Sequence, residues 1–274
     1  MDTPALLNER RGFQTVIFDC DSTLSMIEGI DELARIGGRY DEIKALTDAA
    51  MGGDVPLEDV YDRRLAMLKP TRRDIAAVAD RYREAAVPDA REVVGALHAA
   101  GKRVFIVSGG LLDAVQPFGS WLGVPNDHIR AVSIRYQTAS GVPVTAPVAQ
   151  RDDDRYLQTV ASPLTQANGK SVVAQEVLST ASGRSMLVGD GVSDLVAASE
   201  VDLFVGFTGV VERPRVVAGA DILVTGDSLA PILGLALTAA EETTLEATPH
   251  RNLITRSRAM LKAGELTIQR DLPS

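Results

Sequence analysis

Three short apolar runs constrain the fold of this 274-residue chain more than any other feature of its sequence. The runs cover residues 16–18, 104–107 and 186–188, with two further runs at 203–205 and 222–224. None of the first three alternates apolar with polar residues, which is typical of strands buried on both faces. Helical patterns at residues 90–100 and 171–181 lie between the runs, and each is followed within two residues by glycine. Because strands and helices alternate, the sequence predicts an α/β fold with a doubly wound, mainly parallel sheet.

Three stretches depart from this alternation. Residues 25–86 carry apolar positions at helical spacing without strands between them, which predicts a small inserted helical cap. The α/β core would then comprise residues 1–24 and 87–240. Residues 131–144 alternate apolar and polar positions before a turn, so we expect a hairpin there. Residues 241–274 form a C-terminal extension, which we expect to dock on the core as a helix.

Composition and charge narrow the classes of function. The formal net charge of the chain is −9. Because nucleic acid and anionic lipid bind surfaces with clustered lysine and arginine, neither nucleic acid nor a membrane is an expected partner. Cys20 is the single cysteine, the N-terminal residues lack the apolar core of a signal peptide, and the apolar stretch 229–240 is too short to span a bilayer. We therefore expect a cytoplasmic protein that is a monomer or a homodimer.

Polar and acidic clusters follow the first three runs. They consist of Asp19 and Asp21 after the first, Ser108, Gly109 and Gly110 after the second, and Asp190, Ser193 and Asp194 after the third. Ligands of open parallel sheets bind beyond the carboxyl ends of the strands, so these clusters should meet at one edge. Carboxylates crowded in this way stay ionised only if a cation offsets their repulsion, and Mg²⁺ prefers all-oxygen ligands. The sequence therefore predicts a magnesium site.

Two carboxylates separated by one residue can divide the work of phosphoryl transfer. Asp19, directly after the strand, is the better-fixed nucleophile, and Asp21 would handle the proton on the leaving oxygen. Lys170, Ser108 and the amides of residues 109–110 could stabilise the phosphoryl oxygens. Taken singly, Ser108 could equally be a turn residue or helix cap, and Lys170 would more often be a solvated surface lysine. The occurrence of all three clusters together with Lys170, each where a doubly wound sheet would bring it to one edge, favours the catalytic interpretation.

Other phosphate-binding motifs fit poorly. The NGKS sequence at residues 168–171 resembles the end of a P-loop, but the required first glycine is replaced by Leu164. GDGVSD lacks the third glycine of a dinucleotide-binding fingerprint. Cys20 has no nearby histidine and is interpreted as a small apolar side chain.

The sequence FDCDSTL, with the later SGG, GK and GDGVSD, resembles the haloacid dehalogenase superfamily of aspartyl-phosphate phosphatases over roughly residues 13–226. Within that superfamily, DSTLSMIEGIDELA and the run MGGDVPLEDVYDRRLAML are similar to the phosphoserine phosphatase family. The resemblance implies a Rossmannoid core with a helical cap and a Mg²⁺ cofactor. It implies hydrolysis of a small phosphate ester, O-phospho-L-serine in serine biosynthesis.

The resemblance also implies a role for individual residues. Asp19 would be the nucleophile and Asp21 the general acid and then base, while Asp19, Asp190 and the Asp21 carbonyl would hold Mg²⁺ with support from Asp194. The remaining residues would contact the substrate: Ser108 and Lys170 at the phosphoryl group, Gly109, Gly110 and Ser193 along it, and Glu28 and Arg64 at its amino-acid part. Glu28 suits an ammonium group and Arg64 a carboxylate, although without the resemblance a surface ion pair within the cap would be the better explanation of both residues.

Alternative functions keep or discard this chemistry. The same site could act on another phosphorylated amino acid or a sugar phosphate, or could transfer the phosphoryl group to an acceptor alcohol. A non-catalytic binding module is a more remote alternative, because it would have no use for nucleophile, acid, lysine and metal carboxylates together.

Overall fold

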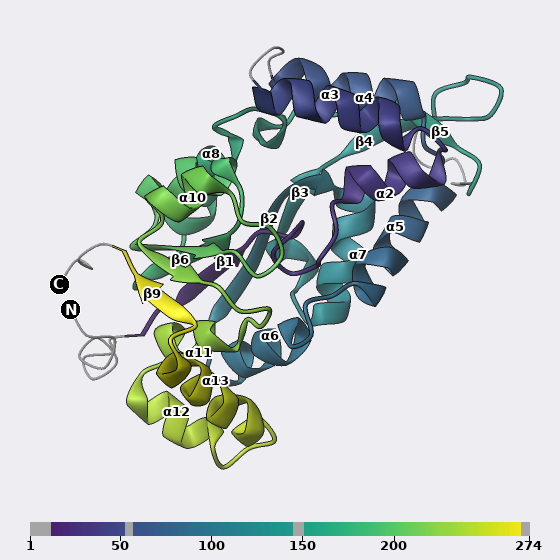
Figure 1. Ribbon diagram of the computed structural model, residues 1–274. Helices are drawn as coiled ribbons and strands as arrows, with labels where there is room; N and C mark the ends of the chain where they lie inside the picture. Colours follow the sequence, from purple (N-terminus) through teal and green to yellow (C-terminus); the bar gives the residue numbers. More distant parts are fainter. Residues whose placement is uncertain (1–11, 53–56, 145–150, 270–274) are drawn as a thin grey trace.

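The computed structural model describes residues 12–52, 57–144 and 151–269. The N-terminal segment, on which the expected lack of a signal peptide rests, lies outside the described residues. The central feature of the structure is a seven-stranded sheet of order β3-β2-β1-β6-β7-β8-β9 (Figure 1). The strands are β1 (Thr15–Phe18), β2 (Arg103–Leu111), β3 (Ile129–Val132), β6 (Ser185–Gly189), β7 (Leu203–Phe207), β8 (Ile222–Val224) and β9 (Leu266–Ile268). All neighbouring pairs are parallel except β8 and β9, so the predicted mainly parallel sheet is confirmed.

Helices cover both faces of the sheet, which explains the unalternating strands. One face packs against α6 (Ala90–Ala99), α7 (Leu112–Leu122) and α11 (Ala230–Ala236), and the other against α8 (Gly169–Ser179), α9 (Val192–Ala197) and α10 (Pro214–Gly219). In β1, Val16 and Phe18 belong to the first core cluster and Ile17 to the second. Each apolar strand residue therefore loses contact with water whichever way it points.

The register of the central strands brings their ends together. Phe18 lies opposite Ile106 of β2 and Val188 of β6, so β1 and β6 end within one residue of each other, whereas β2 continues to Leu111. The residues after β1 and β6 and the last residues of β2 consequently meet at one edge of the sheet, as expected for an open parallel sheet.

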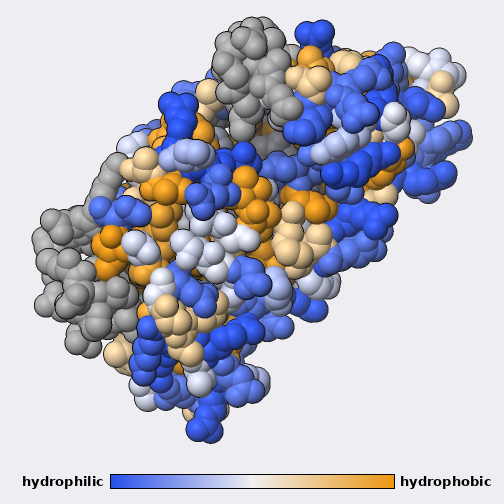
Figure 2. Space-filling view, in the orientation of Figure 1, coloured by the Kyte–Doolittle hydropathy of each residue, from blue (hydrophilic) through white to orange (hydrophobic). Residues whose placement is uncertain are grey.

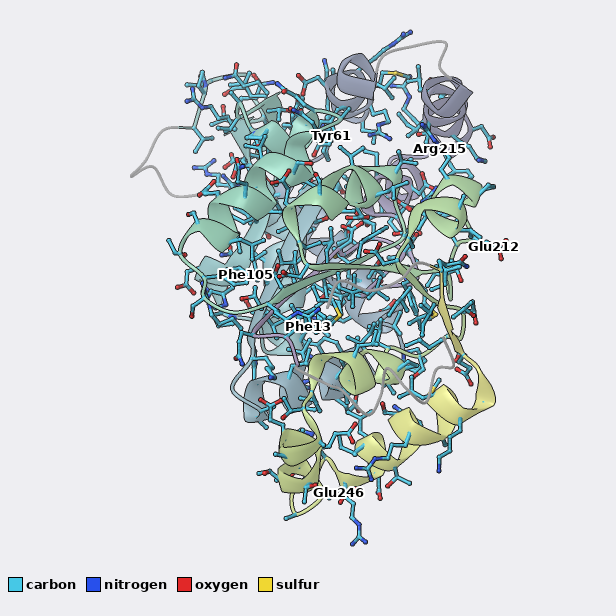
Figure 3. The ribbon with its side chains drawn as sticks, turned by 90° about the vertical axis from the view of Figure 1, so that its left-hand side faces the viewer. Phe13, Tyr61, Phe105, Glu212, Arg215 and Glu246 are labelled. Atoms are coloured by element: carbon cyan, nitrogen blue, oxygen red, sulfur yellow. The ribbon has the colours of Figure 1, made fainter. Side chains whose placement is uncertain are left out.

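Residues between β1 and α6 form a helical insert. Its helices are α2 (Gly29–Ile36), α3 (Tyr40–Gly52), α4 (Leu57–Leu68) and α5 (Arg72–Glu84). The insert leaves and re-enters the core at one point, where Ser25 bridges to Ala86 and Met26 N–H donates to the Ala85 carbonyl at 2.7 Å. Figure 3 shows Tyr61 at the end of the molecule formed by this insert and Glu246 at the opposite end.

The predicted hairpin at residues 131–144 is only partly correct. Val132 belongs to β3 of the main sheet, whereas β4 (Ile134–Gln137) pairs antiparallel with β5 (Arg155–Thr159) in a separate two-stranded sheet. The turn does form, with Gly141 at φ +86° and one bridge from Gln137 to Pro143. Alternation along the chain indicates strand conformation but not which strand is the partner.

The chain ends in α12 (Ala239–Leu245), α13 (Arg251–Ala263) and β9. The side chains of α13 that are buried belong to Leu253, Ile254, Ser257 and Leu261. The fully buried Asp89 accepts hydrogen bonds from the N–H groups of Leu229 and Ala230 and from Arg256 of α13, so one carboxylate links three segments. Strand β9, which the sequence did not predict, extends the sheet at its edge.

Shorter 3₁₀ turns complete the described elements, at Asn126–His128, Pro163–Thr165 and Ala198–Glu200. Figure 2 shows hydrophilic side chains over the C-terminal helices and over the helical insert, with apolar ones gathered between these two ends. In the described part of the chain, every helix is too short or too polar to cross a membrane.

Candidate active site

Asp19 is the first residue after β1 and lies almost completely buried, at 7% exposure. Its N–H donates to the Val188 carbonyl at 2.9 Å, which continues the sheet by one residue and fixes the backbone. Oδ1 accepts the N–H of Cys20 at 2.7 Å, and Oδ2 lies 2.7 Å from Nζ of Lys170. The carboxylate therefore has a fixed orientation.

The Cys20 thiol is buried, and burial raises its pKa, so it is not a reactive thiolate.

Lys170 lies in the first turn of α8 and is buried, so it is not the solvated surface lysine considered as an alternative. Its Nζ lies 2.7 Å from Asp19 Oδ2 and 2.7 Å from Asp194 Oδ1. Burial alone would lower the pKa of the ammonium, but the two carboxylates raise it, so Lys170 stays charged. Gly169 makes this placement possible, because a Cβ there would be 1.9 Å from the Pro163 carbonyl oxygen.

Three buried carboxylates, those of Asp19, Asp190 and Asp194, offer oxygen atoms within 4.8 Å of one another. Burial and the charge of Asp19 raise the pKa of Asp190 to about 6 and that of Asp194 to about 8. A cation bound between buried carboxylates this close together would favour their ionised forms at neutral pH. An all-oxygen set of this kind fits Mg²⁺, and the described residues of the site therefore suit the predicted metal.

The Asp21 carboxylate points to a different part of the pocket. Its Oδ1 accepts the N–H of Gly29 at 2.7 Å and the hydroxyl of Tyr82 at 2.6 Å. Burial, together with the charges of Glu28 and Asp19, raises the pKa of the Asp21 carboxyl well above its ordinary value. A carboxyl group with a raised pKa can remain protonated near neutral pH, which is what a general acid requires. Any contribution of Asp21 to the metal would come from its main-chain carbonyl.

The SGG sequence, which was expected to follow the strand, lies within β2, where the pairing with β3 is irregular between Val107 and Leu111. Ser108 is fully buried and its Oγ accepts the N–H of Gly110 at 3.0 Å. The pocket lining includes Gly109 and Gly110 but not Ser108. A Cβ at Gly110 would lie 3.2 Å from Ser108 Oγ and 3.3 Å from Asp21 Oδ2, so glycine keeps the space between these groups open.

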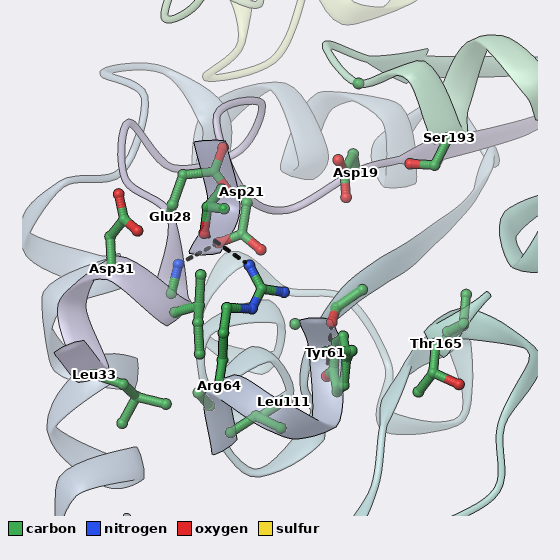
Figure 4. A pocket seen from close by; sticks show the side chains of 18 of the residues that line it. Asp19, Asp21, Glu28, Asp31, Leu33, Tyr61, Arg64, Leu111, Thr165 and Ser193 are labelled. Carbon is green, nitrogen blue, oxygen red and sulfur yellow. Dashed lines mark hydrogen bonds between the residues drawn. The ribbon is translucent and has the colours of Figure 1, made fainter. Parts of the chain in front are cut away.

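A pocket of about 550 Å³ lies between the core and the helical insert. Figure 4 shows Asp21, Glu28 and Arg64 on one side of it and Ser193 and Thr165 on the other. Arg64 is mostly buried, and burial lowers its pKa. Its Nη1 donates to Thr47 Oγ1 at 3.2 Å, while Nε has no hydrogen-bond partner among the described residues. A guanidinium that lines a pocket suits a carboxylate ligand.

Sequence reasoning missed Arg213. Its Nε donates to Asp190 Oδ2 at 2.9 Å, and its Nη2 donates to Glu28 Oε1 at 3.1 Å. It joins the predicted metal carboxylates to the predicted ammonium-binding glutamate. Arg213 follows β7, so its position after a strand was the signal that could have revealed it.

Two polar side chains of the DST sequence also take part. Thr23 donates to Asp190 Oδ1 at 3.1 Å, and Ser22 donates to Glu28 Oε1 at 2.8 Å. Ser22 has φ +53°, a left-handed conformation that is uncommon for residues other than glycine. The loop after β1 is therefore held in a tight, specific turn that connects Asp190 to Glu28.

Tyr61 and Tyr82 were also missed, because nothing in a helical pattern marks a tyrosine as part of a site. Tyr61 of α4 donates to the Gly109 carbonyl at 2.9 Å. Tyr82 of α5 donates to Asp21, as described above. Both tyrosines belong to the helical insert and bind groups of the core.

Comparison with known proteins agrees with this geometry. The family model of haloacid dehalogenase-like hydrolases matches residues 16–199. The chloroplastic phosphoserine phosphatase of Arabidopsis thaliana is 31% identical over 222 residues, which cover 80% of this chain and 71% of that protein. The phosphoserine phosphatase of Bos taurus is 30% identical over 214 residues, which cover 77% of this chain and 88% of that protein.

Among solved structures, a phospho-aspartyl intermediate analogue of phosphoserine phosphatase superposes with a TM-score of 0.66 at 25% identity. The superposition covers 81% of this chain and 98% of that one. The strand-end carboxylates, the buried lysine and the parallel sheet thus occur in a chain whose sequence and fold both match one family. This protein belongs to the haloacid dehalogenase-like hydrolases, in the part of that family that includes the phosphoserine phosphatases.

Proposed function

We propose that this protein hydrolyses O-phospho-L-serine to L-serine and phosphate through an aspartyl-phosphate on Asp19. The observation that carries the proposal is the fixed Asp19 carboxylate, which lies 2.7 Å from Nζ of the buried Lys170, has an oxygen within 4.8 Å of two further carboxylates and lines a pocket of about 550 Å³. The similarity to phosphoserine phosphatases supports the choice of substrate. In the cell the activity would serve serine biosynthesis, and we place it in the cytoplasm.

Recognition of the amino-acid part falls to Glu28 and Arg64. Glu28 would bind the substrate ammonium, and Arg64, whose Nε is free of partners among the described residues, would bind its carboxylate. Ser193 lies across the pocket, near the predicted phosphoryl position. Residues 25–86 would act as the cap that encloses the substrate and limits access of water.

The chemistry has two steps. An Asp19 oxygen attacks phosphorus while the bond from phosphorus to the seryl oxygen breaks, and Asp21 donates its proton to that oxygen. Asp21, now a carboxylate, then takes a proton from water as the water oxygen attacks phosphorus and the bond to Asp19 breaks. Lys170 and the main-chain groups at residues 108–110 stabilise the phosphoryl oxygens in both steps.

Asp19, Asp190 and the Asp21 carbonyl would hold Mg²⁺, with Asp194 as support through its contact with Lys170. When bound, Mg²⁺ supplies positive charge that offsets the charge on the phosphoryl oxygens.

The test is phosphate release by purified protein, with and without Mg²⁺, from L-phosphoserine, phosphothreonine, common sugar phosphates and an aryl phosphate. We expect a Mg²⁺-dependent preference for L-phosphoserine. Asp19→Asn should abolish release, and acid quenching with radiolabelled phosphoserine should trap label on the wild-type protein but not on the variant. Appreciable turnover by Asp19→Asn would exclude covalent catalysis at this residue, whereas a preference for another ester would change only the substrate.

A further inference from the structure

The two oxygens of the Asp21 carboxyl group have different surroundings. Oδ1 accepts two hydrogen bonds, from the Gly29 N–H at 2.7 Å and from the Tyr82 hydroxyl at 2.6 Å. Oδ2 faces Gly110, where an added Cβ would lie 3.3 Å from it. Oδ1 is therefore held by two hydrogen bonds, and Oδ2 faces Gly110, which lines the pocket.

Tyr82 is a rigid donor. Its side chain is fully buried, and its ring stacks on Phe118 of α7 with centroids 5.4 Å apart. Helices α5 and α7, which carry the two rings, pack side by side (Figure 1). Burial raises the pKa of the Tyr82 hydroxyl well above its ordinary value, so the phenol remains a neutral donor throughout any practical pH range.

Gly29 is the residue that admits the Tyr82 hydroxyl. A Cβ at position 29 would lie 2.1 Å from the hydroxyl oxygen and 3.0 Å from the ring carbon that carries it. The same glycine supplies the N–H bound by Asp21. The hydroxyl, the main-chain N–H and the carboxyl oxygen thus form one compact arrangement, with no room for a larger residue at position 29.

We propose that Tyr82 is a positioning residue for the reaction. Its hydroxyl holds the Asp21 carboxyl group so that Oδ2 of Asp21 carries the proton that is delivered to the leaving oxygen. The proposal rests on the function proposed above, in which Asp21 is the general acid. Two donors on Oδ1 disfavour a proton on that oxygen and fix the rotation of the carboxyl group. In the first step the proton moves from Oδ2 to the seryl oxygen as its bond to phosphorus breaks. In the second step Oδ2 accepts a proton from the attacking water.

Tyr82→Phe removes the hydroxyl and keeps the ring that stacks on Phe118. A serine alkoxide is a poor leaving group that needs a proton, whereas nitrophenolate leaves as a stable anion. We expect kcat/KM for L-phosphoserine to fall about 10- to 100-fold, a part of the usual contribution of a general acid, with KM little changed. The kcat/KM for p-nitrophenyl phosphate, which reports the steps up to formation of the aspartyl-phosphate, should change less than about threefold.

Tyr136→Phe is the matched control. The Tyr136 hydroxyl also donates to a carboxylate, that of Asp113, and the residue is largely buried but does not line the pocket. The control should lower the melting temperature by a similar amount and leave both kcat/KM values unchanged. If Tyr82→Phe does not give folded protein, Gly29→Ala tests the same contact, because the added Cβ would lie 2.1 Å from the Tyr82 hydroxyl oxygen and displace it. Gly29→Ala should then produce the same substrate-selective loss.

Asp21→Asn separates failure of this proposal from failure of the proposed function. If Asp21→Asn abolishes phosphoserine turnover and Tyr82→Phe lowers both substrates equally, or neither, the positioning role is wrong and the function stands. If Asp21→Asn retains phosphoserine turnover, Asp21 is not the acid, and the proposed function and the role of Tyr82 both fall.

Discussion

Replacement of Lys170 by methionine should reveal how strongly this one ammonium holds the site together. The Lys170 side chain is 7% exposed, and those of its partners Asp19 and Asp194 are 9% and 0% exposed, so water screens these contacts little. Removal of one partner from a buried ion pair usually costs about 3–5 kcal/mol, because the remaining charge is left without compensation. We expect the Mg²⁺-free Lys170→Met protein to lose this much free energy of unfolding at about pH 9.

The loss should shrink as the pH falls. The pKa of Asp194 is already raised to about 8, against about 3.9 for an aspartate in an unfolded chain. Between about pH 3.9 and about pH 8, Asp194 binds a proton in the folded state that it does not bind in the unfolded state. Lowering the pH through this range therefore stabilises the folded state. Without Lys170 the pKa of Asp194 rises further, and protonation then relieves the unpaired charge. The deficit relative to wild type should therefore be smaller at about pH 6 than at about pH 9.

Urea unfolding of both proteins at the two pH values measures this difference. Lys102→Met is the matched control, because the Lys102 side chain is also buried, at 0% exposure, and lies 2.7 Å from Glu241 away from the pocket. It should lose stability by about 1–3 kcal/mol and keep its phosphatase activity, whereas Lys170→Met should lose both. A deficit for Lys170→Met below about 1 kcal/mol at pH 9, or one that grows as the pH falls, would refute this reasoning.

Three further predictions follow from other contacts. Arg64→Ala should raise KM for L-phosphoserine at least about tenfold, because a charge-assisted pair is lost, with little effect on an aryl phosphate; equal effects on the two substrates would contradict recognition of a carboxylate. Mg²⁺ at about 100 times its Kd should increase the free energy of unfolding by about 2.7 kcal/mol, and Asp190→Asn should remove most of this increase in thermal unfolding. Asp89→Ala should cost about 3 kcal/mol of stability, since several buried donors lose one acceptor, while kcat is unchanged; unfolding curves that match wild type would show that the C-terminal helices dock by other contacts.

Much of the core could be predicted from the sequence because its signals are local. Apolar runs such as residues 16–18 are long enough to identify strands buried on both faces, and the acidic residues that follow them need no information beyond their position. The rule that parallel strands place their carboxyl ends at one edge then brings Asp19 and Asp190 together, although 171 positions separate them in the sequence.

Strand partners could not be predicted in the same way. Residues 134–137 have the alternation of a strand, but the strand that pairs with them is residues 155–159, and the segment directly after the turn adds only a single bridge from Gln137 to Pro143. Likewise, β9 is short and pairs with β8 from a distance of more than forty residues. Hydrogen bonds between strands depend on where whole segments pack, and a short segment carries little information about that.

The sequence by itself determined the chemical groups that are available: carboxyl groups after two of the buried strands and a lysine between them, ordered along a parallel α/β chain. The tertiary structure decided the state of those groups. Lys170 is a buried ion-pair partner of Asp19 because α8 begins close against Pro163, where only a glycine at position 169 fits. The Asp21 carboxyl has two unlike oxygens because α5 brings Tyr82 to one of them. A side chain's identity is a local property, whereas its charge state and orientation depend on burial and on neighbours that the fold brings from distant parts of the chain.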